Sequence, residues 1–293
     1  MNSVVIKAMA KVNLGLDVLS RRENGYHDVK MVMQTVNLYD TLTISKREDL
    51  QILITTNAGE LPLTEDNLIY KAAKLLFDRM NKECGVDIHL DKQIPIAAGM
   101  AGGSTDAAAT LLGLNALYQF GLDKEELAQI GVKIGADVPY CIYGGTYLSE
   151  GIGEILTKLP DAPNCYVVIA KPGIGVSTKY VYENLHIETV SNHPDVDGLV
   201  EAIKAEDLDG VTRKMANVLE NVTIERYPEI AQMKACLEEN GAEKALMSGS
   251  GPTVFGIFKN EDVAKNALDK LNETGLVKQG FVTTFACETG VME

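Results

Sequence analysis

The chain has 293 residues, 46% of them hydrophobic and 23% charged, a balance typical of a globular protein with one large domain or two ordinary ones. A formal net charge of -14 without a dense basic cluster repels nucleic-acid backbones, so we expect no nucleic-acid partner. Since the apolar runs are shorter than the roughly 18 to 20 residues of a membrane helix and charges interrupt the N-terminal segment, we expect no membrane partner and a cytoplasmic location.

In chain order, the first elements are predicted to be strands. Residues 3–22 alternate well enough between apolar and polar side chains for one or two strands, and residues 26–46 resume the pattern. Asn24-Gly25 between these segments is the dipeptide type that most favours a tight hairpin turn. Residues 51–57 are expected to form a further strand.

A helix and a strand precede a glycine-rich run. In residues 64–85, apolar side chains recur at helical spacing, and Asp66 or Asn67 can cap the start of the helix. Residues 85–95 alternate as a strand that leads into the run from Pro95 to Leu112. This run opens directly onto a second helix.

A polar, proline-bearing stretch at residues 157–164 is the candidate linker, which divides the chain into domains at residues 1–157 and 164–293. Before it we expect a helix from Asp123 and then a loop, a short helix and a hairpin over residues 133–156. After it we expect a buried strand at 165–172, amphipathic helices over 196–239, paired strands over 244–258, a helix at 260–275 and a strand at 280–288. Because strands and helices follow in mixed order without regular βαβ alternation, the pattern predicts an α+β fold.

The glycine-rich run has three physical interpretations. Consecutive backbone N–H groups at a helix start can cradle a phosphate, and glycine leaves room for the anion. Glycine also permits a tight turn or close packing without any ligand. A P-loop or dinucleotide-binding fold is disfavoured because neither GxxxxGK[ST] nor GxGxxG is present. Ser104 and Thr105 offer hydroxyls at the helix start that suit Mg²⁺ or a phosphate oxygen, or an N-cap.

Two segments resemble motifs of the GHMP kinase superfamily. Residues 95–115, PIAAGMAGGSTDAAATLLGLN, are similar to its second motif, and residues 244–258, KALMSGSGPTVFGIF, to its third. Residues 10–44 and 134–156 resemble the branch of the superfamily that serves the non-mevalonate isoprenoid route. The resemblance implies a two-domain fold, with an N-terminal domain like domain 2 of ribosomal protein S5 and a C-terminal ferredoxin-like α/β sandwich.

The same resemblance implies an ATP-dependent kinase that phosphorylates the 2-hydroxyl of a cytidine diphosphate-linked methylerythritol. Lys11 and Asp137 correspond to the catalytic pair of the family. A carboxylate can orient or accept the proton of the attacked hydroxyl, and a cation keeps that carboxylate ionised. Judged on local sequence alone, Asp137 fits a helix N-cap equally well and Lys11 fits a solvated strand residue.

Further site residues follow from the resemblance. The residues expected to bind ATP are Pro95, Ile96, Ala97, Ala98, Gly99, Met100, Ala101, Gly102, Gly103, Ser104 and Thr105. The residues expected to bind the substrate are Asn13, Tyr26, His27 and Tyr182, with Tyr182 preferred over Tyr180 as the second aromatic beside the cytosine. Mg²⁺ is expected to bridge the ATP phosphates, and whether Ser104, Thr105 or Asp106 contacts it stays open.

Other features leave alternatives. The five cysteines are scattered without a CxxC pair, so we expect reduced thiols and no metal site formed by the protein alone. A kinase of the same superfamily acting on homoserine, mevalonate or a sugar is a second hypothesis, and a catalytically inactive ligand sensor is a third. Both a monomer and a homodimer are compatible with the sequence.

Overall fold

The long hairpin predicted at the N-terminus organises the molecule. The structure is a computed structural model that describes residues 2–190, 192–287 and 291–292. β1 (Ser3–Arg21) and β2 (His27–Arg47) pair antiparallel along almost their whole length, and Gly25 in the connecting turn has a φ of 85°. The hairpin signal at Asn24-Gly25 is thus confirmed, because a positive φ is the backbone state that glycine adopts without a steric penalty.

The hairpin forms the centre of the first sheet, which has eight strands among the described residues. The other six are β3 (Ile52–Thr56), β4 (Gly85–Asp91), β5 (Thr146–Glu150), β6 (Ile155–Lys158), β8 (Ala216–Asn217) and β12 (Val291–Met292). The main path runs β12-β1-β2-β4-β3, while β5 pairs with the part of β2 nearest the turn and β6 pairs with β5.

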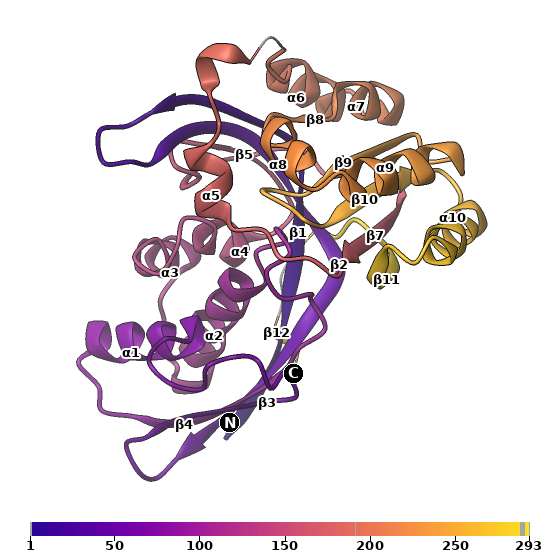
Figure 1. Ribbon diagram of the computed structural model, residues 1–293. Helices are drawn as coiled ribbons and strands as arrows, with labels where there is room; N and C mark the ends of the chain where they lie inside the picture. The colour runs from indigo at the N-terminus through magenta and orange to yellow at the C-terminus, as the bar shows by residue number, and fades with distance from the viewer. Residues whose placement is uncertain (1, 191, 288–290, 293) are drawn as a thin grey trace.

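Four helices cover one face of this sheet (Figure 1). They are α1 (Leu68–Met80), α2 (Gly102–Tyr118), α3 (Lys124–Gly131) and α4 (Val138–Tyr143). The side chain of Asn67 accepts a hydrogen bond from the Ile69 amide, so Asn67 is the cap of α1 that the sequence left open between two residues. At the centre of the layer, Gly113 of α2 lies where a Cβ would come within 2.5 Å of Ile44 and 3.0 Å of Ile6. The absence of a side chain there lets the helix lie directly on the sheet.

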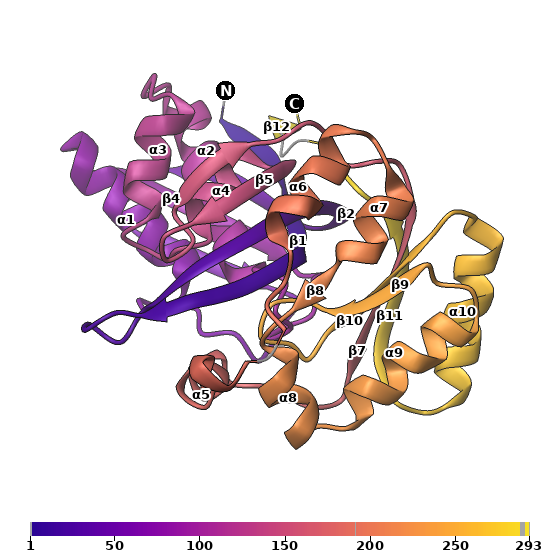
Figure 2. The same cartoon turned by 90° about the horizontal axis from the view of Figure 1, so that it is seen from above.

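The second sheet has the order β11-β7-β10-β9. Its strands are β7 (Tyr166–Pro172), β9 (Lys244–Met247), β10 (Val254–Phe258) and β11 (Val277–Thr284). Figure 2 shows α9 (Glu229–Glu239) and α10 (Glu261–Glu273) on the side of this sheet that faces away from the hairpin. The opposite face packs on the hairpin, where Val12 and Leu14 share a buried cluster with Ile169 and Phe255.

The remaining elements connect the two sheets. They are α5 (Thr178–Glu183), the 3₁₀ helix η1 (Ile187–Thr189), α6 (Val196–Lys204), α7 (Leu208–Lys214) and α8 (Glu220–Arg226). The α+β class is confirmed, because helices and the strands of two sheets follow one another in mixed order. The strands β8 and β12 lie beyond the linker in the sequence and nevertheless join the first sheet by pairing with β1. The exact division at residues 157–164 stays a prediction, and Glu288 at the end of the last predicted strand lies outside the described residues.

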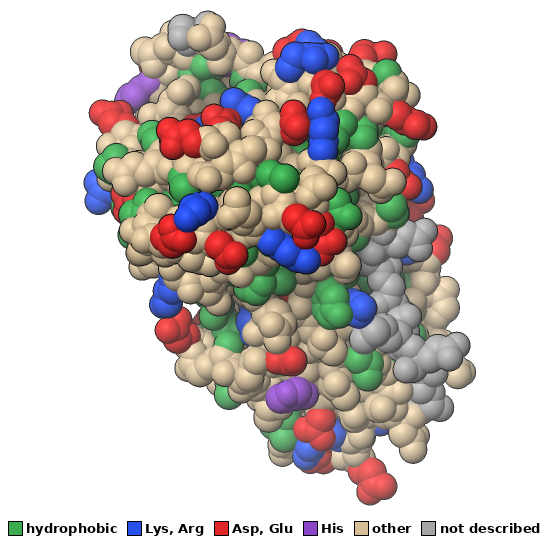
Figure 3. Space-filling model, turned by 90° about the vertical axis from the view of Figure 1, so that its right-hand side faces the viewer, with side chains coloured by type: hydrophobic (Ala, Val, Ile, Leu, Met, Phe, Trp, Pro, Cys, Tyr) green, Lys and Arg blue, Asp and Glu red, His purple; other side chains and the backbone are tan. Residues whose placement is uncertain are grey.

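The surface carries both signs of charge. On the face seen in Figure 3, acidic and basic side chains alternate without a continuous basic stripe. Among the ion pairs of the described residues, Lys259 pairs with Asp209 at 2.6 Å and lies 3.5 Å from Glu243. Within the described ranges, no helix has the length and apolarity to cross a membrane.

Candidate active site

Irregularities in β1 turn Lys11 and Asn13 toward the helices. Along β1, the side chains of Ile6 and Ala8 belong to the core beneath the helices, whereas those of Val12 and its neighbours of even number face the second sheet. The strand changes face because its register with β2 shifts between Met9 and Lys11 and again between Asn13 and Gly15. At the second shift β1 has one residue, Leu14, that no residue of β2 opposes, and an extra residue in a strand with a side-chain period of two exchanges its two faces.

Lys11 is buried, which overturns its interpretation as a solvated strand residue; its side chain is 5% exposed. Its ammonium group donates to Asn13 Oδ1 at 2.7 Å and to the Gly99 carbonyl at 3.4 Å, and lies 3.8 Å from Asp137 Oδ2. Asp137 occupies the N-cap position of α4, but its side chain makes no capping hydrogen bond. The carboxylate is turned to Lys11 instead, and the two side chains form a charged pair at the edge of a cleft.

The glycine-rich run lines this cleft, which has a volume of about 1070 Å³. Every predicted ATP-binding residue from Pro95 to Ser104 contributes to the lining. Helix α2 begins at Gly102, and its N-cap residue, Ala101, offers no side-chain cap. The amide groups of the first turn are therefore left for another acceptor. Thr105 is the exception among the predicted residues, because its buried hydroxyl donates to the Met9 carbonyl at 2.8 Å and the side chain does not line the cleft.

Glycine is needed at different positions of the run for different physical reasons. A Cβ on Gly99, whose φ is +72°, would lie 2.2 Å from the carbonyl oxygen of Ser248. At this position glycine is required by protein packing, because the backbone of the third motif occupies the space. Gly103 is exposed in the cleft, and a Cβ there would meet only Leu68 Cδ1, at 3.4 Å. The requirement for ligand space therefore fits Gly103 and not Gly99.

The third motif closes on the site. Ser248 Oγ donates to the Gly99 carbonyl at 2.9 Å, and Gly249 and Ser250 line the cleft. Asn217 of β8 holds this turn from behind, since its side-chain amide donates to the carbonyls of Met247 at 2.9 Å and Gly249 at 2.8 Å. Sequence reasoning missed Asn217, because a two-residue strand has no periodic signal.

The same turn reaches α5, the helix that carries Tyr182. The hydroxyls of Ser250 and Thr178 lie 2.8 Å apart, and Thr178 and Tyr182 both line the cleft. The rings of Tyr182 and His27 lie 5.2 Å apart between centroids and are tilted by 38°. Tyr180 lies elsewhere, with its ring 4.8 Å from the guanidinium of Arg226. Of the two tyrosines, Tyr182 is thus the one that the fold brings to His27.

The two residues that follow the hairpin turn differ in exposure. The side chain of Tyr26 is 58% exposed at the mouth of the cleft, whereas His27 is buried. Burial lowers the pKa of the His27 imidazole below its ordinary value, and the positive charge of Arg21 lowers it further. Burial raises the pKa of the Tyr182 hydroxyl, and Asp137 contributes in the same direction. Both rings are therefore neutral at neutral pH.

A second charged cluster lies under the start of α2. Lys92 contacts Asp40 and lies 2.9 Å from Asp106, and all three side chains are almost fully buried. Asp40 also accepts hydrogen bonds from the amides of Gln93 at 2.6 Å and Ile94 at 2.8 Å, which fixes the segment entering the glycine run. Burial raises the pKa of Asp106 well above its usual range, and the neighbouring Asp40 charge adds to the increase.

A strand-period signal could have found two members of this cluster. Lys92 is in phase with the buried residues Ile88 and Leu90, and Asp40 is in phase with Leu42 and Ile44. A charged residue on the buried face of a predicted strand marks a group that must be paired.

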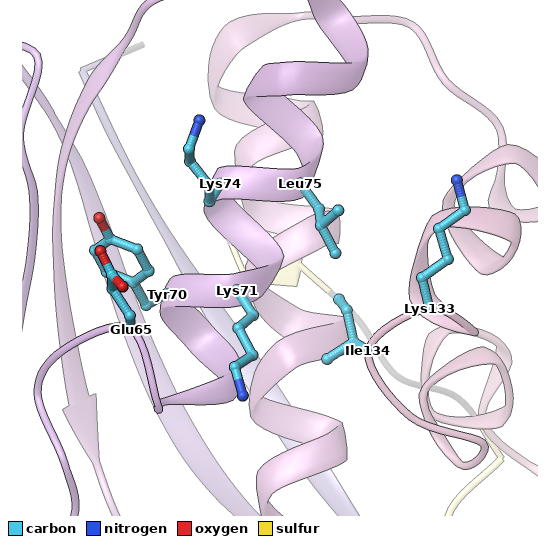
Figure 4. A pocket seen from close by; sticks show the side chains of 7 residues that line it. All are labelled: Glu65, Tyr70, Lys71, Lys74, Leu75, Lys133 and Ile134. Atoms are coloured by element: carbon cyan, nitrogen blue, oxygen red, sulfur yellow. The ribbon is translucent and has the colours of Figure 1, made fainter.

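The molecule has another hollow, with a volume of about 430 Å³, between α1 and α3. Figure 4 shows Lys71 and Lys74 on one side of it and Lys133 on the other, with Leu75 and Ile134 between them. None of the predicted site residues line it. Across the part of the chain that the structure describes, no three histidine, cysteine or acidic residues gather in a way that could hold a metal ion.

Known proteins resemble the whole chain. The family descriptions "GHMP kinases N terminal domain" and "GHMP kinases C terminal" match residues 67–145 and 199–276. The 4-diphosphocytidyl-2-C-methyl-D-erythritol kinase of Lachnoclostridium phytofermentans is 53% identical over 97% of this chain and 98% of its own length. The enzyme of the same name from Lachnospira eligens is 52% identical over the same shares.

Solved structures support the same family and confirm the two-domain GHMP kinase fold that the resemblance implied. A crystal structure of 4-(cytidine 5'-diphospho)-2C-methyl-D-erythritol kinase covers 96% of this chain and 99% of its own, with 32% identity and a TM-score of 0.82. Homoserine kinase from Cytophaga hutchinsonii, at 21% identity and a TM-score of 0.80 over 100% of this chain and 98% of its own, shares the fold. By its motifs, its architecture and its full-length relatives, the chain belongs to the 4-diphosphocytidyl-2-C-methyl-D-erythritol kinase family of the GHMP kinases.

Proposed function

We propose that the protein transfers the γ-phosphoryl group of ATP to the 2-hydroxyl of 4-diphosphocytidyl-2-C-methyl-D-erythritol. The observation that carries this proposal is the pair formed by the buried Lys11 and the half-buried Asp137, 3.8 Å apart, at the Gly99 end of an uncapped helix start. Phosphoryl transfer asks a protein chiefly for positioning and for neutralisation of charge. The full-length relatives that bear the enzyme's name supply the choice of substrate.

Asp137 and Lys11 have different roles toward the alcohol whose oxygen attacks the γ-phosphorus. The Asp137 carboxylate orients the hydroxyl and accepts its proton as the oxygen attacks the γ-phosphorus. The Lys11 ammonium lies 3.8 Å from that carboxylate and offers positive charge to the phosphoryl group during its transfer. Asn13 holds the Lys11 ammonium at 2.7 Å, and so limits its conformations before the substrate arrives.

The start of α2 is the proposed phosphate site. The amides of Gly102, Gly103 and Ser104 belong to a first turn that has no side-chain cap, and a helix N-terminus attracts an anion. Mg²⁺ would supply neutralisation of the β and γ oxygens, and the Ser104 hydroxyl in the cleft is a hard oxygen donor that suits it. A full protein cage is not needed, because Mg²⁺ keeps several waters and binds the nucleotide itself.

The cytosine is proposed to bind between Tyr26 and Tyr182, in the part of the cleft away from the proposed phosphate site. An exposed ring at the mouth and a partly buried ring on α5 can contact a base on two sides. His27 lies beside Tyr182 in its neutral form, and it can hydrogen-bond the edge of the pyrimidine.

A panel of candidate alcohols tests this proposal. Purified protein is mixed with ATP, Mg²⁺ and either the cytidyl substrate, homoserine or mevalonate, and ADP release is followed. We expect release only with the cytidyl substrate. Turnover of another alcohol in its place would favour the second hypothesis, and ATP binding without turnover of any alcohol would favour a sensor. Asp137→Asn is the matched control, which should bind ATP and release no ADP.

A further inference from the structure

One oxygen of the charged cluster under α2 has no partner. Asp106 Oδ2 lies 2.9 Å from the Lys92 ammonium, but Oδ1 has no hydrogen-bond partner in the part of the chain that the structure describes. The side chain is only 3% exposed, and Asp106 lines the cleft. A buried polar atom without a partner is unfavourable, so an oxygen in this position is a place where a ligand can contribute a hydrogen bond.

The position of Asp106 along the glycine run indicates which part of ATP it meets. The Gly99 end of the run lies at Lys11, where the Lys11 ammonium is 3.4 Å from the Gly99 carbonyl. The Gly102 end lies at Lys92, whose Nζ would be 3.0 Å from a Cβ on Gly102. If phosphoryl transfer takes place at Lys11, as proposed above, the nucleotide extends away from that end, and its nucleoside lies toward Lys92 and Asp106.

The chemistry around Asp106 fits a nucleoside better than a phosphate. Oδ1, which has no partner, can accept a hydrogen bond from a hydroxyl or amino group of the nucleoside, whereas an ionised phosphate oxygen is itself an acceptor and offers it no donor. Leu68, Pro95 and Leu61 line the same cleft and offer apolar surface for a base. The Asn67 side chain is already used, since it accepts from the Ile69 amide and donates to the Pro62 carbonyl. Asp106 Oδ1 is thus a polar atom still available among these apolar residues.

We propose that Asp106 binds the nucleoside of ATP, with Oδ1 hydrogen-bonded to a ribose hydroxyl or to the 6-amino group of the adenine. The proposal rests on the proposed function, because it takes ATP as the nucleotide. Lys92 is a positioning residue in this arrangement: it holds Asp106 through Oδ2, and its contact with Asp40 links the carboxylate to β2.

Calorimetric binding of four nucleotides tests the role of Asp106. ATP, 2'-deoxyATP, 3'-deoxyATP and purine riboside triphosphate, each with Mg²⁺ and no acceptor substrate, are titrated into the wild type and Asp106→Ala. We expect Asp106→Ala to weaken ATP binding about 10- to 100-fold. One of the three analogues lacks the hydroxyl or amino group that bonds Asp106 Oδ1. For that analogue, the affinities of the wild type and Asp106→Ala should differ by less than about threefold. Thr110→Val is the matched control, because Thr110 is a fully buried polar residue of α2 that does not line the cleft.

Asp106→Ser is the second variant in case the Asp106→Ala protein does not fold. Serine keeps a hydroxyl near Lys92 and lacks the Oδ1 atom that is proposed to contact the nucleoside. An equal loss with all four nucleotides, or ATP binding as tight as in the wild type, would overturn the role of Asp106. A wild-type protein that binds none of the nucleotides would overturn the proposed function as well, so the two failures are distinguishable.

Discussion

Replacing Gly99 by alanine should destabilise the protein itself, even in the absence of any nucleotide. The new Cβ would lie 2.2 Å from the Ser248 carbonyl oxygen and 3.0 Å from that of Gly251. A non-glycine residue at the φ of +72° observed for Gly99 costs about 1 to 2 kcal/mol. Relief of the overlap adds about 1 to 3 kcal/mol. The sum is about 2 to 5 kcal/mol, which corresponds to a loss of about 4 to 20 °C in Tm for a chain of this size.

Gly103→Ala is the matched control for this prediction. Gly103 lies in α2, and the only atom within 4 Å of its added Cβ would be Leu68 Cδ1, at 3.4 Å. Alanine is favoured over glycine in a helix by up to about 1 kcal/mol, so Tm should stay constant or rise slightly. Because the methyl group would occupy cleft space, ATP affinity should fall about tenfold.

Thermal unfolding without nucleotide and calorimetric ATP binding separate the two effects. We expect Gly99→Ala to have a lower Tm than the wild type. Gly103→Ala should bind ATP more weakly than the wild type without a lower Tm. A Gly99→Ala protein with the Tm of the wild type would refute the reasoning, because it would mean that the third motif does not hold this loop.

Three further predictions concern the reacting groups and the cytosine. Asp137→Asn and Lys11→Met should each lower kcat by about 100-fold or more, measured as ADP release, with ATP affinity within about threefold of the wild type; equal losses of affinity would contradict a catalytic role. Tyr182→Ala should raise KM for the cytidyl substrate by about 10- to 100-fold through lost stacking, while Tyr182→Phe and Tyr180→Ala stay near the wild type; a similar effect of both alanine variants would count against the assignment. Since the pKa of His27 is lowered, its neutral form persists below pH 6.5 and protonation at lower pH should raise KM for the cytidyl substrate; a His27→Asn variant with the same pH profile would contradict this.

Local signals predicted the elements that depend on local physics. The hairpin followed from Asn24-Gly25, and the start of α1 from a cap residue and a helical apolar period. The strands β8 and β12 were missed, because each has two residues and exists only through its pairing with β1. Such strands are determined by tertiary contacts that no short window of sequence contains.

The site divides in the same way. The resemblance brought Lys11, Asp137, His27 and Tyr182 to attention, and the fold places them around one cleft, although their roles remain to be tested. It did not indicate that Gly99 is packed against protein, since that contact is 149 residues distant in sequence. Nor did it indicate the register shifts that turn Lys11 inward, because the alternation of apolar and polar side chains along β1 continues through them without a break.

The contact between Gly99 and Ser248 also bears on how the enzyme matures. The glycine run is made early during translation, but the turn that supports it is synthesised 149 residues later. At about 5 to 20 residues per second, the nascent chain would carry an unsupported loop for about 7 to 30 seconds. A ribosome-bound chain that ends before Ser248 should therefore fail to retain ATP, and nucleotide capture would begin only once the segment that contains Ser248 has emerged.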